Sequence, residues 1–252
     1  MKISIITVTF NSEETLEDTI TSVADQVYND VEHIVIDGGS SDGTLEILDK
    51  YKDKLSKIVS EEDDGIYDAM NKGIGLATGE VIGFLNSDDF FSGTEVLSSI
   101  AKAFQDPQVQ ACHADLVYVD SDDPGKVVRY WKSQEYKAGL FEKGWMPAHP
   151  TFYVRSSVYR QYGIFDTQYK FHSDMELTAR FFIKGEIKTL YLPEVWVKMR
   201  TGGTTNKTIK NIIRGNMESY RACKNLGLKL TPFYFFTKFV MRIPQFFQRP
   251  EL

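Results

Sequence analysis

Cysteine is scarce in this sequence of 252 residues, and long apolar runs are absent. The two cysteines, Cys112 and Cys223, form neither a disulfide framework nor a metal-ligand spacing, so we expect a reducing, cytoplasmic location. No run approaches the roughly 20 apolar residues of a membrane-spanning helix. We expect no signal peptide, because the short N-terminal apolar stretch ends at Asn11 and two glutamates.

Lysine and arginine are scarce in the front half of the chain. Residues 1–125 carry 7 basic against 26 acidic side chains, residues 126–199 carry 12 against 7, and residues 200–252 carry 10 against 2. An acidic front half argues against nucleic acid as a partner and suits a protein that holds a cation. The length allows one large α/β domain, with or without an appendage.

Strand-like and helix-like segments alternate along the front of the chain. Strands are expected at 2–9, 32–36, 57–60 and 80–85, and helices from Glu13, over 44–51 and over 66–77. Asn11 or Ser12 is the expected N-cap of the first helix. The alternation predicts an α/β fold, with a mostly parallel sheet and helices on both faces.

The back of the chain has a different pattern. We expect antiparallel strands at 110–119 and 127–131, a helix at 135–141, a strand at 188–199 and an amphipathic helix at 206–226. Ser173 and Glu176 have the spacing of a capping box, which predicts a helix that begins there.

Polar side chains follow each of the four front strands. They are Thr9 and Asn11, Asp37, Asp63 and Asp64, and finally Asn86, Asp88 and Asp89. Ligands of open α/β sheets bind beyond the carboxyl ends of the strands, so these groups predict a binding site. Because two adjacent carboxylates repel each other and are costly to bury, we expect positive charge beside Asp88 and Asp89.

Five fragments in order resemble the family 2 glycosyltransferases, inverting enzymes of the GT-A fold that include builders of bacterial surface polysaccharides. The fragments are SIITVTFNSEETL (4–16), VIDGGSSDGT (35–44), DDGIYDAMNKGIGLATGEVIGFLNSDD (63–89), HPTFYVR (149–155) and FHSDMELTAR (171–180). The resemblance implies a GT-A-like single domain at 1–204, with a nucleotide-binding part (1–92) and an acceptor part (93–204). Residues 205–252 would form a C-terminal helical extension.

By this resemblance, the protein moves a sugar from a nucleotide-diphosphate donor to a glycan or lipid-linked glycan acceptor. The family's Asp-x-Asp motif usually ligates Mn²⁺ or Mg²⁺ through its last aspartate, and here it reads Asn86-Ser87-Asp88. We therefore expect Asp88 to be a metal ligand, with Asp89 as second choice. Asn86 brings no charge, but it can hydrogen-bond a ribose or a metal-bound water.

The resemblance also implies contacts with the nucleotide. Thr9 and Asn11 would help to hold it, Asp37 would contact the base, and Asp64 would contact the base or sugar. Two structural alternatives remain open: Asp37 caps the glycine turn that follows it, and Asp64 belongs to a solvated acidic run.

Asp174 is the expected catalytic base, again by resemblance. An inverting transfer needs a carboxylate that removes the acceptor's proton. A carboxylate in the first turn of a helix also stabilises the helix dipole, which is the structural alternative for Asp174. Glu176 is the other candidate base.

Three further residues are candidates for the pocket. Trp145 and His149 lie in an aromatic, proline-containing loop that suits an acceptor sugar, and Arg200 suits a phosphate. The alternatives are a packed histidine at 149, with His172 equally ambiguous, and a flexible loop at Arg200.

The segment 231–249 contains seven aromatic residues interspersed with Lys238, Arg242 and Arg249. This composition is typical of a helix that lies on a membrane surface, here the inner face of the membrane. Packing on the core and a dimer contact are the alternatives, and the oligomeric state stays open.

Three other functions are compatible with an α/β sheet and polar strand ends. A nucleotidyltransferase usually has a basic, glycine-rich loop after its first strand, where this chain has the acidic TFNSEETL. A haloacid-dehalogenase-like phosphatase needs an aspartate where Ser40 stands, so we reject it. A non-catalytic or degenerate nucleotide-sugar-binding protein remains the alternative function.

Overall fold

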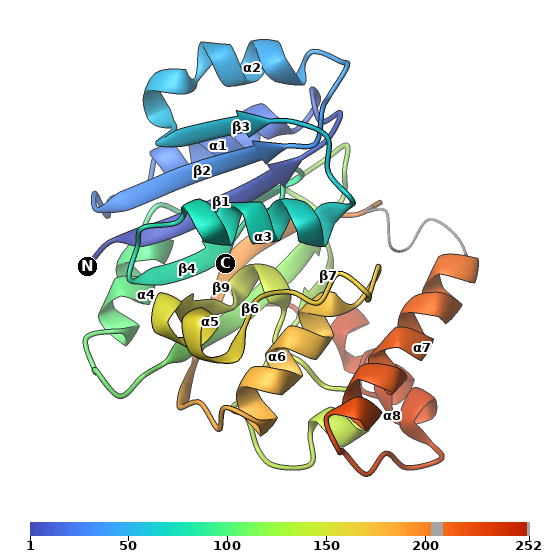
Figure 1. Ribbon diagram of the computed structural model, residues 1–252. Coiled ribbons are helices and arrows are strands. Elements are labelled where there is room, and N and C mark those ends of the chain that lie inside the picture. Colours follow the sequence, from blue (N-terminus) through green and yellow to red (C-terminus); the bar gives the residue numbers. More distant parts are fainter. Residues whose placement is uncertain (203–208, 251–252) are drawn as a thin grey trace.

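Nine strands form one sheet in the part of the chain that the computed structural model describes, residues 1–202 and 209–250 (Figure 1). Their order is β3-β2-β1-β4-β8-β6-β9-β5, with β7 paired to β6. The strands are β1 Ile3–Thr9, β2 Val31–Asp37, β3 Lys57–Ser60, β4 Val81–Phe84, β5 Asp89–Phe91, β6 Ala111–Val119, β7 Val127–Trp131, β8 Tyr153–Arg155 and β9 Thr189–Arg200.

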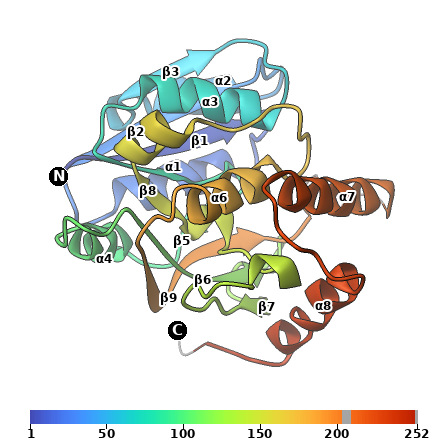
Figure 2. The ribbon, with the colours of Figure 1, turned by 60° about the horizontal axis from the view of Figure 1, so that its bottom comes forward.

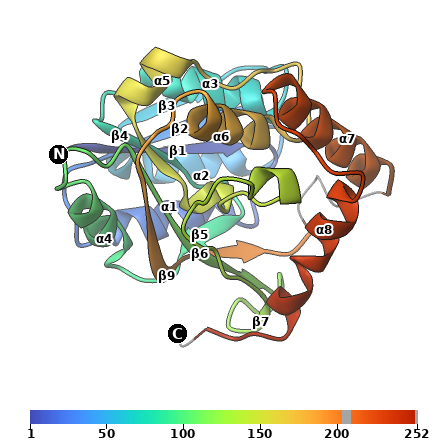
Figure 3. The ribbon, with the colours of Figure 1, turned by 90° about the horizontal axis from the view of Figure 1, so that it is seen from below.

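The helices cover both faces of this sheet. They are α1 Leu16–Ala24, α2 Thr44–Lys50, α3 Ile66–Leu76, α4 Val96–Ala103, α5 Ser156–Tyr162, α6 Ser173–Ile183, α7 Ile209–Asn225 and α8 Tyr234–Val240. The helices α3, α5 and α6 lie on one side of the sheet, and α4 lies on the other (Figures 2 and 3). Among these described residues, no helix is long and apolar enough to cross a membrane.

Strand pairing confirms the expected α/β class. β1 pairs in parallel with β2 and β4, and β2 pairs in parallel with β3. In the back half, β6 is antiparallel to β7 and β8 but parallel to β9. Parallel pairing therefore dominates the front of the sheet, and the predicted antiparallel pair at 110–119 and 127–131 is confirmed.

Alternation along β1 divides the core between the two faces. Ile6 belongs to the buried cluster of Met70 from α3 and Leu177 from α6, whereas Ile5 packs in the cluster of Leu97 and Ile100 from α4. Successive residues of a strand point to opposite faces, so one apolar strand supports helices on both sides.

The C-terminal extension, α7 and α8, lies at one end of the molecule, away from α2 (Figures 1 and 3). It packs through Cys223 and Leu226, which join the main core cluster, and Gly227 follows α7 with φ 85°. After α8 the chain reaches β7, where Arg129 donates to Gln245 at 2.8 Å. The predicted boundary at 204/205 and the helix start at Asn206 lie outside the described residues.

Two local predictions are wrong. The first helix begins at Leu16 with Thr15 as its N-cap, and neither Asn11 nor Ser12 caps it with a side chain. The segment 135–141 is not helical, and only Phe141–Lys143 form a short 3₁₀ turn. Gly139 there adopts φ 91°, and Phe141 packs into an aromatic cluster instead. Tertiary packing overrode the local preference.

Candidate active site

The carboxyl ends of β1, β2 and β4 meet at one edge of the sheet, as the sequence predicts. The amide of Gly38 donates to the Thr9 carbonyl at 2.9 Å, which joins the loops after β1 and β2. The hydroxyls of Ser12 and Ser87 lie 2.9 Å apart and join the loops after β1 and β4. The polar groups of separate strands therefore form one edge, which we call the donor edge.

Asp37 is buried at the end of β2 and holds the glycine turn that follows it. Its carboxylate accepts hydrogen bonds from the amides of Gly39 and Ser40 and from the hydroxyls of Ser40 and Ser60. This is turn capping, the alternative that the sequence left open. Its predicted contact with the base stays a prediction.

Thr9 and Asn11 shape the adjoining loop. The buried Thr9 hydroxyl has no hydrogen-bond partner in residues 1–202 and 209–250. Asn11 adopts φ 49°, in the left-handed region that asparagine tolerates, and its side chain accepts the amide of Ser41 at 2.9 Å. Asn11 therefore joins two loops of the donor edge and does not cap a helix.

Asp63 faces this loop more closely than Asp64 does. A Cβ on Gly38 would lie 2.5 Å from the Asp63 carboxylate, so a glycine is needed for this approach. Asp64 is exposed, and its carbonyl accepts the Lys170 ammonium at 3.2 Å. Asp63 and Asp64 belong to an acidic run, residues 61–64, and the sequence alone does not indicate which carboxylate of the run faces the edge.

Asp88 and Asp89 form an acidic turn after β4. The amide nitrogen of Asn86 donates to Asp89 Oδ2 at 3.0 Å, while Asp89 Oδ1 and Asn86 Oδ1 are buried without a partner among the described residues. Burial raises the pKa of both carboxyl groups, and the charge of Asp88 raises the pKa of Asp89 further. Such a pair favours a nearby cation.

Arg200 supplies the positive charge that is expected beside Asp88 and Asp89. Its guanidinium donates to the Asp88 carbonyl at 3.0 Å, pairs with the Asp18 carboxylate and lies 4.8 Å from the centre of the Phe90 ring. All three contacts are made to other residues of the protein, so Arg200 holds the acidic turn in place. Its predicted pairing with phosphate stays a prediction.

The oxygens of this turn fit a hard divalent cation, because Mg²⁺ and Mn²⁺ prefer carboxylate and amide oxygens. Asp88 is partly exposed at the edge, whereas Asp89 is fully buried. Within the described ranges, no cluster of three or more His, Cys, Asp or Glu side chains forms a complete metal site. A cation at Asp88 would therefore need oxygens from a bound substrate.

A cavity of about 690 Å³ lies between Asn86 and the C-terminal extension. This volume is typical of small-molecule sites. Its lining includes Asn86, Tyr67, Trp145, His149, Asp174 and Lys238. The predicted residues Thr9, Asn11, Asp37, Asp64, Asp88 and Arg200 lie outside this lining, so the cavity continues from the donor edge rather than containing it.

Asp174, the second residue of α6, is half-buried at this cavity. Its Oδ1 accepts the Tyr67 hydroxyl at 3.1 Å and the Met175 amide at 2.8 Å. No described residue donates to its Oδ2, which leaves that oxygen free to accept a proton. Tyr67 has no sequence signal for this role, because the contact joins residues 107 positions apart.

The predicted capping box is wrong. His172 is the N-cap of α6, and Ser173 donates its hydroxyl to the Asp166 carbonyl at 2.9 Å. Glu176 is buried and pairs with Arg180 at 3.0 Å. The carboxylate of Glu176 is thus engaged by Arg180, and the residue lies outside the cavity lining. Of the two candidate bases, Asp174 is therefore the one that lies at the cavity.

His149 and Trp145 line the cavity, but their ring nitrogens are buried and have no partners among the described residues. His149 stacks on Phe84 with ring centres 5.3 Å apart, and neither of its ring nitrogens is hydrogen-bonded. Burial lowers its pKa, so the ring is neutral near pH 7. The indole nitrogen of Trp145 is likewise unpaired.

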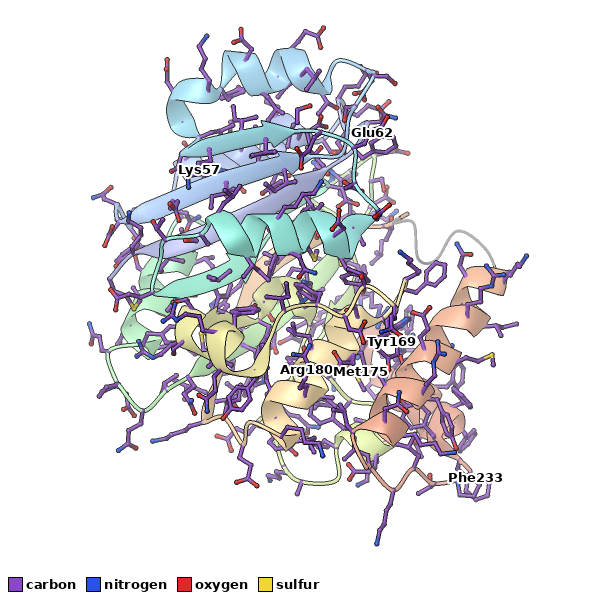
Figure 4. All side chains as sticks on the ribbon, in the orientation of Figure 1. Lys57, Glu62, Tyr169, Met175, Arg180 and Phe233 are labelled. Atoms are coloured by element: carbon purple, nitrogen blue, oxygen red, sulfur yellow. The ribbon has the colours of Figure 1, made fainter. Side chains whose placement is uncertain are left out.

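Glu218 of α7 ties the C-terminal extension to the loop before Asp174. Its carboxylate accepts the amides of Lys170, Phe171 and His172 at 3.2, 2.8 and 3.1 Å. Gly215 permits the approach, because a Cβ there would lie 2.3 Å from the His172 ring. Figure 4 shows Tyr169 where this loop meets α7 and Phe233 pointing away at the outer end of the extension.

The chain belongs to glycosyl transferase family 2, which it matches over residues 4–164. A PGL/p-HBAD biosynthesis glycosyltransferase of Mycobacterium bovis is 29% identical over 209 residues, which cover 82% of this chain and 79% of that protein. A cholesterol galactosyltransferase of Borreliella burgdorferi is 42% identical over 106 residues, covering 40% of this chain and 30% of that one.

Two solved structures confirm the GT-A-like fold. S. aureus TarS has a TM-score of 0.67 at 18% identity and covers all of this chain, which spans 44% of the TarS chain. The mannosyltransferase PcManGT from Pyrobaculum calidifontis, solved with GDP-Man and Mn²⁺, has a TM-score of 0.67 at 19% identity, with 93% of this chain and 66% of that chain covered.

Replacing Tyr67 with phenylalanine tests its support of Asp174. We expect Tyr67→Phe to lose about 1 kcal/mol of stability and about tenfold in turnover, with donor affinity unchanged. Tyr162→Phe is the control, because its hydroxyl bonds only the Gly185 carbonyl, at 3.3 Å. Urea unfolding and nucleotide release measure the two effects. Equal turnover in both variants would contradict the assignment.

Proposed function

We propose that this protein transfers a hexosyl group, with inversion, from a nucleotide-diphosphate sugar to a glycan or lipid-linked glycan in bacterial cell-surface polysaccharide synthesis. The observation that carries the proposal is Asp174, a fixed carboxylate with one free oxygen at a cavity that reaches Asn86. Family membership supports it, as do related folds solved with UDP-GlcNAc and GDP-Man.

Inversion proceeds by one in-line displacement in this proposal. The acceptor hydroxyl oxygen bonds to the anomeric carbon, and the bond from that carbon to the donor phosphate oxygen breaks. The nucleoside diphosphate leaves with the electron pair, and the hydroxyl proton passes to Oδ2 of Asp174. Tyr67 and the Met175 amide fix Oδ1, which keeps Oδ2 in one position.

The donor is proposed to lie at the donor edge. Thr9, Asn11 and the turn held by Asp37 would border the nucleotide, with Asp64 beside it. Asp88 would hold Mn²⁺ or Mg²⁺, ahead of the fully buried Asp89, and Asn86 would supply an uncharged oxygen. A bound divalent cation stabilises negative charge on the leaving diphosphate. The Mn²⁺ in the PcManGT complex supports this choice.

The acceptor is proposed to occupy the cavity. Trp145 and His149 belong to its lining, and aromatic side chains suit the apolar ring faces of a sugar. Arg200 acts from outside the cavity lining by holding the acidic turn in place.

The C-terminal extension is proposed to contact an anionic lipid surface at the cytoplasmic face of the membrane. The chain carries 10 basic against 2 acidic residues over 200–252, and this charge complements anionic lipid. The exposed aromatic surface consists of Phe233, Phe235, Phe236, Phe239, Phe246 and Phe247. Such a surface is unusual on a free protein. Lys238 is buried and lies apart from it.

A nucleotide panel tests the proposal. Thermal shifts with UDP, GDP, dTDP and CMP, each with and without Mn²⁺, should show one diphosphate that raises the melting temperature more strongly with Mn²⁺. Asp88→Asn should abolish the Mn²⁺ increment, because the cation loses its charged ligand. An increment that survives Asp88→Asn would refute this ligand, and no shift with any nucleotide would refute the donor class.

Turnover of the matching donor separates an enzyme from the alternative, a non-catalytic nucleotide-sugar-binding protein. Asp174→Asn should keep the thermal shift and lose at least 100-fold in nucleotide release, a typical general-base contribution. Asp166→Asn, in the same loop but outside the cavity lining, is the control. Donor binding without release in the unmodified protein would favour the binding protein.

Vesicle sedimentation tests the membrane contact. Phe236→Ser combined with Phe247→Ser should weaken binding to phosphatidylglycerol vesicles about tenfold or more, because exposed apolar area is removed. Val27→Ser, exposed elsewhere on the molecule, is the control. Equal binding by both variants, or a vesicle-free dimer that only the double variant loses, would contradict the membrane assignment.

A further inference from the structure

Lys238 of α8 is buried in the wall of the cavity without a carboxylate partner. The residue is 8% exposed, and its ammonium group reaches the Ser219 hydroxyl at 3.3 Å. An ammonium group has three donors, so two remain unpaired in the described part of the chain. Burying a cation without an anion costs free energy, so this arrangement points to an anionic ligand.

Arg242 adds a second cation to the same wall. It lines the cavity, and no described residue accepts a hydrogen bond from its guanidinium. Burial lowers the pKa of Lys238 to about 8, and the charge of Arg242 lowers it as well. The two cations therefore repel each other in the free protein, and an anion bound between them would remove this repulsion.

Neighbouring acidic groups do not neutralise this end of the cavity. Asp174 attracts the Lys238 ammonium but forms no ion pair with it within 4 Å. The Glu218 carboxylate is engaged by three backbone amides. Arg129, bonded to Gln245, adds further positive charge nearby.

The cavity brings these cations into one space with the proposed chemistry. Asn86 enters it from the donor edge, Asp174 from α6, and Lys238 and Arg242 from the extension. The exposed aromatic surface lies on the same extension, on α8 and the residues on either side of it. The two cations and the surface proposed to meet lipid therefore belong to the same C-terminal extension.

We propose that Lys238 and Arg242 form a subsite for a phosphate group of the acceptor. This rests on the proposed function, because it names the chemical class of acceptor on which Asp174 acts. A phosphate carries more than one charge and several acceptor oxygens, which suits an ammonium and a guanidinium together. The phosphate belongs either to a lipid-linked glycan or to a soluble phosphorylated glycan.

Calorimetric titration of the full chain tests the subsite, with and without a saturating nucleoside diphosphate to fill the donor edge. The probes are geranyl phosphate, inorganic phosphate and uncharged geraniol. Lys238→Met and Arg242→Gln should each weaken geranyl phosphate binding about tenfold or more, as expected for a charge-assisted hydrogen bond. Lys229→Gln, an exposed change on the extension outside the cavity, should leave it unchanged.

Equal geranyl phosphate affinity in Arg242→Gln and Lys229→Gln would overturn the subsite, and so would geraniol binding as tightly as its phosphate. Arg242 is exposed, so its variant keeps the test valid if Lys238→Met fails to fold. Inorganic phosphate that binds as tightly as geranyl phosphate would support the subsite with a soluble source. Phosphate binding that depends on Lys238 and Arg242, in a protein that binds no nucleotide, would refute the proposed function but not the phosphate subsite.

Discussion

The carboxylate of Glu218 holds the site together, because it accepts three successive backbone amides of the loop that delivers Asp174. Without it, those amides and the helix that carries Glu218 would lose their shared anchor. The C-terminal extension is therefore part of the wall around the candidate base. The same helix brings Gly215 against His172, whose pKa burial lowers to about 4, so the contact is uncharged at neutral pH.

Comparable long-range contacts hold the other functional groups. Tyr67 in the front half reaches Asp174, and Arg200 at the end of β9 braces both Asp88 and Asp18. Elements of the back half of the chain thus hold functional groups of the front half in place, and elements of the front half hold those of the back half. This division explains why the donor edge is built from strand ends, whereas the cavity is closed by helices that arrive later in the chain.

Much of this organisation was predictable. Parallel strands deliver their carboxyl ends to one edge, so a periodic pattern and polar strand ends located the donor edge. Positions that depend on tertiary contacts were not predictable: Asn11 joins a second loop instead of capping, Glu176 pairs with Arg180, and Lys238 turns into the cavity. Composition placed Lys238 in a basic, aromatic tail, but only the fold separates it from the exposed aromatic surface.

The most direct measurement is the amide hydrogen exchange of Lys170, Phe171 and His172 in the Glu218→Ala variant. Loss of the shared acceptor should speed exchange at these three amides, while exchange in the β1–β4 part of the sheet stays as in the unmodified chain. Unchanged exchange at residues 170–172 would contradict the claim that the extension anchors the loop of Asp174.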